Sequence, residues 1–199
     1  MATEAPTAPV ETPVRRPMRA DAQRNYDRLI ESARETFTEL GGDTPLEEVA
    51  RRAGVGIGTL YRHFPTRLDL LETIYREDVD RLSALARTLT SEREPWAALE
   101  GWLEEFSAYA ATKRVLFQEI VAVAGKDAEV FIHSRAAIGE AGELVLNNAQ
   151  RAGVVRADIE VSDVTRLVGG CTMMPGSDAA QQRRMLQLVL DGIRVPPRA

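Results

Sequence analysis

Residues 46–64, LEEVARRAGVGIGTLYRHF, restrict the fold of this chain more than any other segment. Two short helical patterns meet at Gly54, where a glycine allows the backbone to turn tightly. The small side chain of Ala50 lets the second helix pack closely against the first. The residues predicted to face the core are Leu46, Val49, Ala50, Val55, Leu60 and Phe64. This pattern predicts a helix-turn-helix.

The other residues of the second helix face outward in this interpretation. Hydroxyl, imidazole and guanidinium groups there are donors that phosphates and base edges accept, and a glycine permits close backbone approach. The outward residues are Gly58, Thr59, Tyr61, Arg62 and His63. The segment therefore indicates DNA binding, and the alternative is a generic helical hairpin with ordinary surface polar residues.

Helical periodicity surrounds this segment. A first helix is expected from about Ala20 to Leu40, ended by two glycines, and Thr44 is predicted to cap the next helix in a capping box with Glu47. Thr66 is expected to cap a long fourth helix that spans about 30 Å. Further helices are expected from Pro95 and near 114–124, 127–152, 161–174 and 178–193. With no useful strand pattern, the prediction is an all-α chain of about nine helices.

The N-terminal residues 1–17 contain four of the ten prolines and little to bury, so a disordered arm is expected. Neither a secretory signal nor an apolar stretch long enough for a membrane span is found. The single cysteine, Cys171, excludes an intramolecular disulfide, and the cytoplasm is the expected location. The net charge is −5, yet residues 15–68 hold ten arginines against eight acidic residues. A basic region on an acidic body is compatible with nucleic-acid binding.

The segment AGVGIGTLYRHF, followed by PTRLDLLE, closely resembles the DNA-binding domain of the TetR family. The resemblance covers about residues 20–75 and includes Phe37, Gly41, Thr44 and the LEEVA run. It implies a three-helix DNA-binding domain over 18–66, a long connecting helix, and a ligand-binding and dimerisation domain within 67–199. By position it implies DNA contacts from Thr59, Tyr61 and His63 and a phosphate contact from Arg67. The whole expected DNA-binding set is Thr44, Gly56, Ile57, Gly58, Thr59, Tyr61, Arg62, His63 and Arg67.

Two of these positions depart from the family pattern. Gly56 stands where Ser or Thr is often found, and Ile57 is apolar. Ile57 is expected either to touch a thymine methyl group or to pack within the protein.

The C-terminal part of the chain carries no diagnostic motif. Large side chains recur on one side of the helix that begins at Pro95, and they predict either a pocket wall or part of the core. A lysine at the end of this row would favour a carboxylate or phenolate ligand. The candidate pocket residues are Trp102, Phe106, Tyr109, Lys113, Phe117 and His133. His133 has no partners at metal-ligand spacing, so neither a metal nor a cofactor is expected.

At residues 185–190 of the last helix, apolar side chains occupy most of the helix circumference. A helix that packs on one side needs only a single apolar face. A homodimer interface formed with the helix near 161–174 is predicted, and burial within one subunit is the alternative. The functional prediction is a ligand-responsive repressor that binds a palindromic operator in double-stranded DNA as a dimer and is released by a small-molecule effector. The alternative is a helical ligand- or partner-binding protein with a degenerate helix-turn-helix. No catalytic constellation supports an enzyme.

Overall fold

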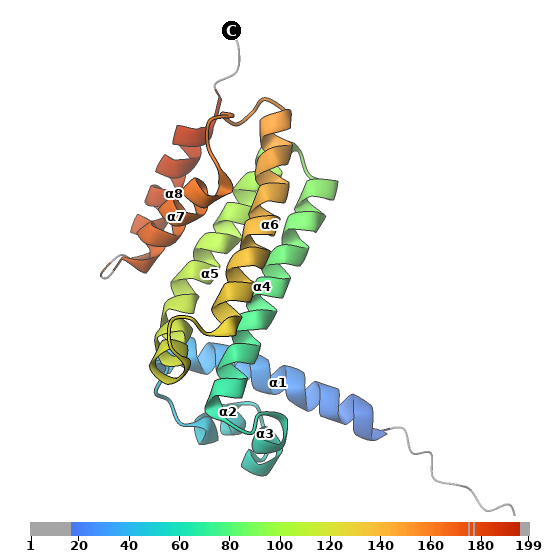
Figure 1. Ribbon diagram of the computed structural model, residues 1–199. Coiled ribbons are helices and arrows are strands. Elements are labelled where there is room, and N and C mark those ends of the chain that lie inside the picture. The colour runs from blue at the N-terminus through green and yellow to red at the C-terminus, as the bar shows by residue number, and fades with distance from the viewer. Residues whose placement is uncertain (1–16, 175, 177, 196–199) are drawn as a thin grey trace, which may run out of the picture.

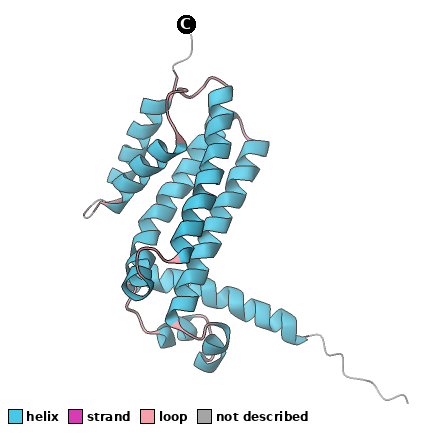
Figure 2. Cartoon of the chain, viewed as in Figure 1, coloured by secondary structure: helices cyan, strands magenta, loops and turns pink. Residues whose placement is uncertain are grey.

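The computed structural model describes residues 17–174, 176 and 178–195. Within these residues the regular structure is helical, apart from one isolated antiparallel bridge between Val155 and Arg194 (Figure 2). The helices are α1 (Pro17–Leu40), α2 (Leu46–Arg52), α3 (Ile57–His63), α4 (Arg67–Glu92), α5 (Pro95–Ala124), α6 (Glu129–Arg151), α7 (Val161–Met173) and α8 (Ala179–Ile193). The predicted all-α class is confirmed. Of the predicted N-terminal arm, residues 1–16 lie outside the described residues.

Helix α5 replaces two of the predicted helices. The segments expected from Pro95 and near 114–124 form one continuous helix of 30 residues. The reason is local, because no glycine or proline interrupts the chain between Trp102 and Ala124.

Three long helices, α4, α5 and α6, form the body of the molecule, and α7 and α8 pack beside it (Figure 1). Helix α4 packs along both α5 and α6 and continues into the N-terminal helices, where it also contacts α1. Helix α1 crosses the end of the body, with α2 and α3 beyond it (Figure 1). The helix-turn-helix is thus held at one end of a long helical scaffold.

A single hydrophobic core runs through both parts of the chain. Phe37, Val49 and Leu60 are buried among the N-terminal helices, and the same cluster continues through Leu71 and Ile74 of α4 into the body. The N-terminal helices therefore do not have a core separate from that of the larger part.

The two predicted helix starts differ in outcome. Thr66 caps α4 in a capping box, in which its hydroxyl accepts from the Asp69 amide and its own amide donates to the Asp69 carboxylate. The capping box predicted at Thr44 is wrong. Helix α2 begins at Leu46 with Pro45 in the capping position, and the Thr44 hydroxyl donates to the Gly41 carbonyl at 2.8 Å.

Candidate functional sites

The turn between α2 and α3 depends on Gly54, whose φ of 63° lies in the left-handed region. Its amide donates to the Arg51 carbonyl, and the Val55 amide donates to the Ala50 carbonyl. These two bonds form a Schellman motif, which satisfies the last carbonyls of α2 and ends the helix sharply. The chain can then reverse and begin α3 within three residues of Gly54.

Helix α3 has one buried side and one open side. Leu60 is 0% exposed, and Phe64, directly after the helix, is 2% exposed. Away from these two residues, Tyr61 is 45% exposed and Ile57 is 37% exposed, with Arg62 also exposed. A Cβ atom added at Gly58 would meet no atom within 4 Å. The open side can therefore approach a flat or grooved partner without obstruction.

Three of the predicted DNA-binding residues lie on the edges of this open side. Gly56 is exposed directly before the helix, and Thr59 is half-buried. The His63 ring packs against the rings of Tyr26, at 6.0 Å, and Phe64, at 6.1 Å between centroids. His63 is thus positioned by α1, and its ring also has a structural role.

Thr44 and Arg67, two further predicted DNA-binding residues, lie in the turn before α2 and at the start of α4. The Thr44 side chain is buried, and the Arg67 Nη1 donates to the Thr44 carbonyl at 2.8 Å. The Arg67 guanidinium also lies over the Phe37 ring, 5.0 Å from its centroid. Both residues therefore join the start of α4 to α1 and to the turn before α2, and neither side chain belongs to the open side of α3.

Charge near the turn is largely neutralised within the protein. Arg51 and Arg52 both donate to the Glu48 carboxylate, which holds the pKa of Glu48 down at about 2. Arg52 also pairs with Glu39. In the part of the chain that the structure describes, Arg62 forms no ion pair, so it is the guanidinium on α3 that can meet a phosphate or a base.

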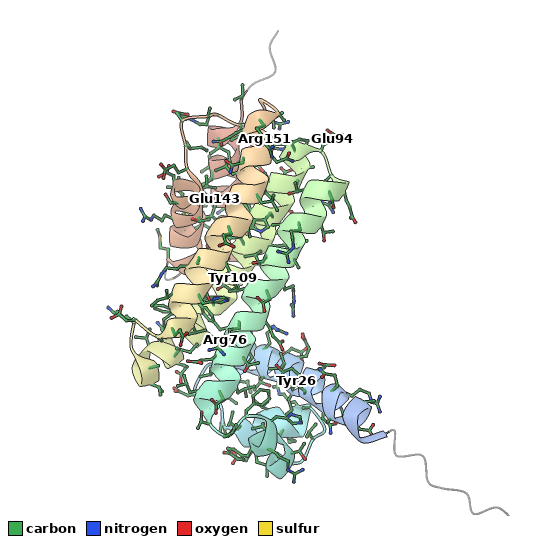
Figure 3. The ribbon with its side chains drawn as sticks, turned by 45° about the vertical axis from the view of Figure 1, so that its right-hand side comes forward. Tyr26, Arg76, Glu94, Tyr109, Glu143 and Arg151 are labelled. Carbon is green, nitrogen blue, oxygen red and sulfur yellow. The ribbon has the colours of Figure 1, made fainter. Side chains whose placement is uncertain are left out.

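Two adjacent acidic residues of α4 hold α1. The Tyr26 hydroxyl donates to the Glu77 carboxylate at 2.9 Å, and burial together with this contact raises the pKa of Tyr26 to about 12. The Arg34 Nε donates to Asp78 Oδ1 at 2.9 Å, and burial raises the pKa of Asp78 against the opposing effect of Arg34. Figure 3 shows Tyr26 on α1 near its crossing with α4. Sequence spacing could not reveal these contacts, because their partners are 51 and 44 residues apart.

The aromatic row on α5 is mainly part of the core. Trp102 is 0% exposed, and its indole N–H donates to the Leu82 carbonyl at 3.1 Å. Its ring stacks on Phe106 with centroids 5.5 Å apart, and Tyr109 lies 6.2 Å beyond Phe106. Trp102 and Phe106 therefore pack within the protein, and Tyr109 lines a pocket as well.

Lys113 ends the row, as the sequence suggested. Its ammonium lies over the rings of Tyr75 and Tyr109, 4.8 and 5.2 Å from their centroids. Burial, and to a lesser extent the positive charge of Arg135, lowers the pKa of Lys113 to about 8. Phe117 packs on Phe131 at 4.8 Å, which links it to the same aromatic group through Tyr75. His133 is exposed on α6, and the structure records no contact that brings it into this group.

A pocket of about 340 Å³ opens where α1, α4 and α5 meet. Figure 3 shows Tyr109, a residue of α5, midway along the helical body. The lining residues are Arg34, Asp78, Arg81, Leu82, Leu85, Glu105, Ala108 and Tyr109. Of the candidate pocket residues only Tyr109 is among them. The sequence missed the other lining residues because periodicity within α5 does not show which residues of α1 and α4 pack beside it.

Comparison with known proteins places these features in a family. A model of the bacterial regulatory proteins of the tetR family matches residues 29–74, and a model of the SbtR-like transcriptional regulator C-terminal domain matches residues 94–195. The chain belongs to the TetR family. As a TetR-family helix-turn-helix transcriptional regulator, it uses α2 and α3 as the motif recognised in its sequence.

Solved structures of TetR-family regulators resemble the whole chain. A regulator from Streptomyces coelicolor is 38% identical, with 86% of this chain and 99% of that chain covered and a TM-score of 0.74. One from Mycobacterium vanbaalenii is 35% identical over 90% of this chain and 100% of its own, also with a TM-score of 0.74. An HTH-type transcriptional regulator of Staphylococcus aureus is 39% identical over 64 residues. That match spans 32% of this chain and 35% of the Staphylococcus aureus protein, about a third of each.

The last two helices of this TetR-family chain carry exposed apolar side chains. Leu188 of α8 is 72% exposed and Leu167 of α7 is 55% exposed, whereas Leu186 and Leu190 face the protein's own core. The expected two-sided apolar character of the last helix is thus present. Across the described ranges, no helix combines the length and apolar character that crossing a membrane would need.

Proposed function

We propose that this regulator is a repressor that binds a palindromic operator as a dimer and leaves it when a small-molecule effector binds the larger part of the chain. The observation that carries the proposal is the open side of α3, where Ile57, Tyr61 and Arg62 stand exposed beside Gly58. A helix of this kind fits the major groove, and two copies must be one DNA turn apart, about 34–36 Å, to bind both half-sites.

The first test is selection of the operator from fragments of the source genome, followed by measured affinities for single-base variants of it. Arg62→Ala is expected to change sequence preference, with a loss of about 1–3 kcal/mol at one base pair, because a guanidinium can bind a guanine edge. Tyr61→Phe is expected to weaken binding to all variants alike, because a hydroxyl on phosphate carries no sequence information. If Tyr61→Phe reorders the variants while Arg62→Ala does not, the two roles are reversed.

The dimer is proposed to form through the exposed faces of α7 and α8. Leu167 and Gly170 are exposed on α7, Met174 is exposed directly after it, and Leu188 lies exposed on α8. Apolar side chains exposed on two neighbouring helices indicate an interface, since a second copy would remove them from water. In a symmetric dimer each of these residues is used twice.

Leu188→Asp is expected to yield folded monomers. A symmetric dimer contains Leu188 twice, so the substitution removes two leucines from the interface. At about 1.5–3 kcal/mol for each buried leucine, the loss of association free energy is roughly 3–6 kcal/mol. Sedimentation velocity with circular dichroism measures both properties. Ile132→Asp is the matched control, because Ile132 is 56% exposed on α6, a helix outside the proposed interface, and should leave the dimer intact. A dimer that persists in Leu188→Asp would contradict this interface.

Effector release requires only that ligand and operator favour different arrangements of the dimer. A coupling of about 1–3 kcal/mol changes operator affinity roughly 5- to 150-fold. Support comes from the pocket between α1, α4 and α5, since it lies against the helix that connects the two parts of the chain.

A further inference from the structure

The pocket between α1, α4 and α5 differs from an ordinary cavity of the larger part because α1 supplies one of its walls. Arg34 is the lining residue from α1, and its guanidinium is paired with Asp78 of α4, which also lines the pocket. Both side chains are largely buried, with exposed fractions of 15% and 13%. A molecule in this pocket therefore touches the ion pair that ties the DNA-binding helices to α4.

The remaining charges of the lining stand on two different helices. Arg81 belongs to α4 and Glu105 to α5, and both are exposed. Among the residues described here, neither side chain takes part in an ion pair. Arg34 pairs with Glu31 as well as with Asp78, and Glu77 lies 3.9 Å from its guanidinium. Arg81 and Glu105 are therefore the lining charges that stand outside these ion pairs. Each would attract an opposite charge and repel a like one.

The rest of the lining is apolar. Leu82 and Leu85 of α4 face Ala108 and the Tyr109 ring of α5 across the pocket. A volume of about 340 Å³ lies near the lower end of the range for small-molecule pockets, roughly 300–1,000 Å³. The pocket thus combines an apolar middle with one cationic and one anionic group.

We propose that this pocket binds a small amphipathic zwitterion, with its anionic group at Arg81, its cationic group at Glu105 and its apolar part over Leu82 and Tyr109. A plain carboxylic acid would be repelled by Glu105, and a plain amine by Arg81. A zwitterion satisfies both groups and adds no net charge. The bound molecule also lies beside the Arg34–Asp78 pair, so that occupancy changes how α1 is held. This last step rests on the proposed function.

The test places the ligand chemistry in the pocket covalently, so that no natural effector is needed. The full chain carries Cys171→Ser and Ala108→Cys, and the new thiolate is converted to mixed disulfides by exchange with the symmetric disulfides of four small thiols, each exchange releasing one equivalent of the free thiol. Cysteine supplies both charges, cysteamine the ammonium alone, 3-mercaptopropionate the carboxylate alone, and ethanethiol neither. The same four adducts at Ala136→Cys, an exposed α6 position that does not line the pocket, are the control.

The cysteine adduct at position 108 is expected to have the highest melting temperature of the four, and Arg81→Gln or Glu105→Gln should abolish that advantage. It is also expected to weaken operator binding at least fivefold relative to the ethanethiol adduct. Equal melting temperatures for the four adducts would contradict the proposed zwitterion site. The same conclusion would follow if the cysteine adduct kept the highest melting temperature in both glutamine variants.

The two measurements separate this inference from the proposed function. If the unmodified chain selects no operator, the repressor proposal fails, while the order of melting temperatures still decides the pocket chemistry. If the operator is bound and every adduct leaves its affinity unchanged, the pocket is not the place from which DNA binding is controlled.

Discussion

Replacing Gly142 with valine is expected to lower the free energy of unfolding by about 1–3 kcal/mol, the usual cost of overpacking a filled core. A Cβ atom at this position of α6 would lie 2.4 Å from Cγ2 of Val161 and 3.0 Å from the Trp102 ring. Neither neighbour can move freely, because Val161 begins α7 and Trp102 is stacked on Phe106 and bonded to α4. Chemical denaturation of the purified protein measures the loss.

Gly139 provides the matched control for Gly142. It lies one turn earlier on α6, where an added Cβ would meet nothing within 4 Å. Gly139→Ala should therefore raise stability by up to about 1 kcal/mol, because alanine favours the helix over glycine. If Gly142→Ala stabilises the protein as much as Gly139→Ala does, close packing of α6 against α7 and Trp102 is not what requires the glycine.

The second large effect concerns DNA. Gly58→Glu is expected to weaken operator binding by at least about 100-fold. The substitution would bring a carboxylate on the open side of α3 against the DNA phosphates, and like charges at an interface cost several kcal/mol. The fold should be unaffected, because the space around Gly58 is open. Affinity for the selected operator, measured by fluorescence anisotropy, gives the result.

Gly58→Gln separates charge from size, because glutamine has nearly the shape of glutamate. We expect it to retain much more affinity than Gly58→Glu, with the difference shrinking as salt is added. Wild-type affinity in both variants would mean that the open side of α3 does not face DNA.

The parts of the fold that the sequence predicted depend on local signals. Thr66 and Asp69 are three residues apart, and Gly54 directly follows a helical pattern, so both could be identified without knowing the fold. The same reasoning failed at Thr44, where Pro45 took the capping position. It also divided α5, although no helix-breaking residue stands between the two predicted parts.

The pocket could not be predicted in the same way. Periodicity shows that Trp102 and Tyr109 share a side of one helix, but it does not show which neighbours cover each of them. Trp102 is covered by α4 and Phe106, whereas Tyr109 meets the junction with α1. The direction of the Arg67 side chain could not be predicted either. It points toward Phe37 and Thr44, which lie about 30 and 23 residues earlier in the chain.

The two side-chain contacts between α4 and α1 limit how the DNA-binding helices can move. Tyr26 and Arg34 are eight residues apart, about 12 Å along the helix axis, and they are held by the neighbouring Glu77 and Asp78. These two contacts oppose rotation of α1 about its own axis unless one of them breaks. Because α1 also packs against α2 and shares a core with α3, a swing of α4 carries all three helices with it. We therefore expect the face that α3 presents to be preserved during such a swing, and the distance between the two α3 helices of the proposed dimer to change.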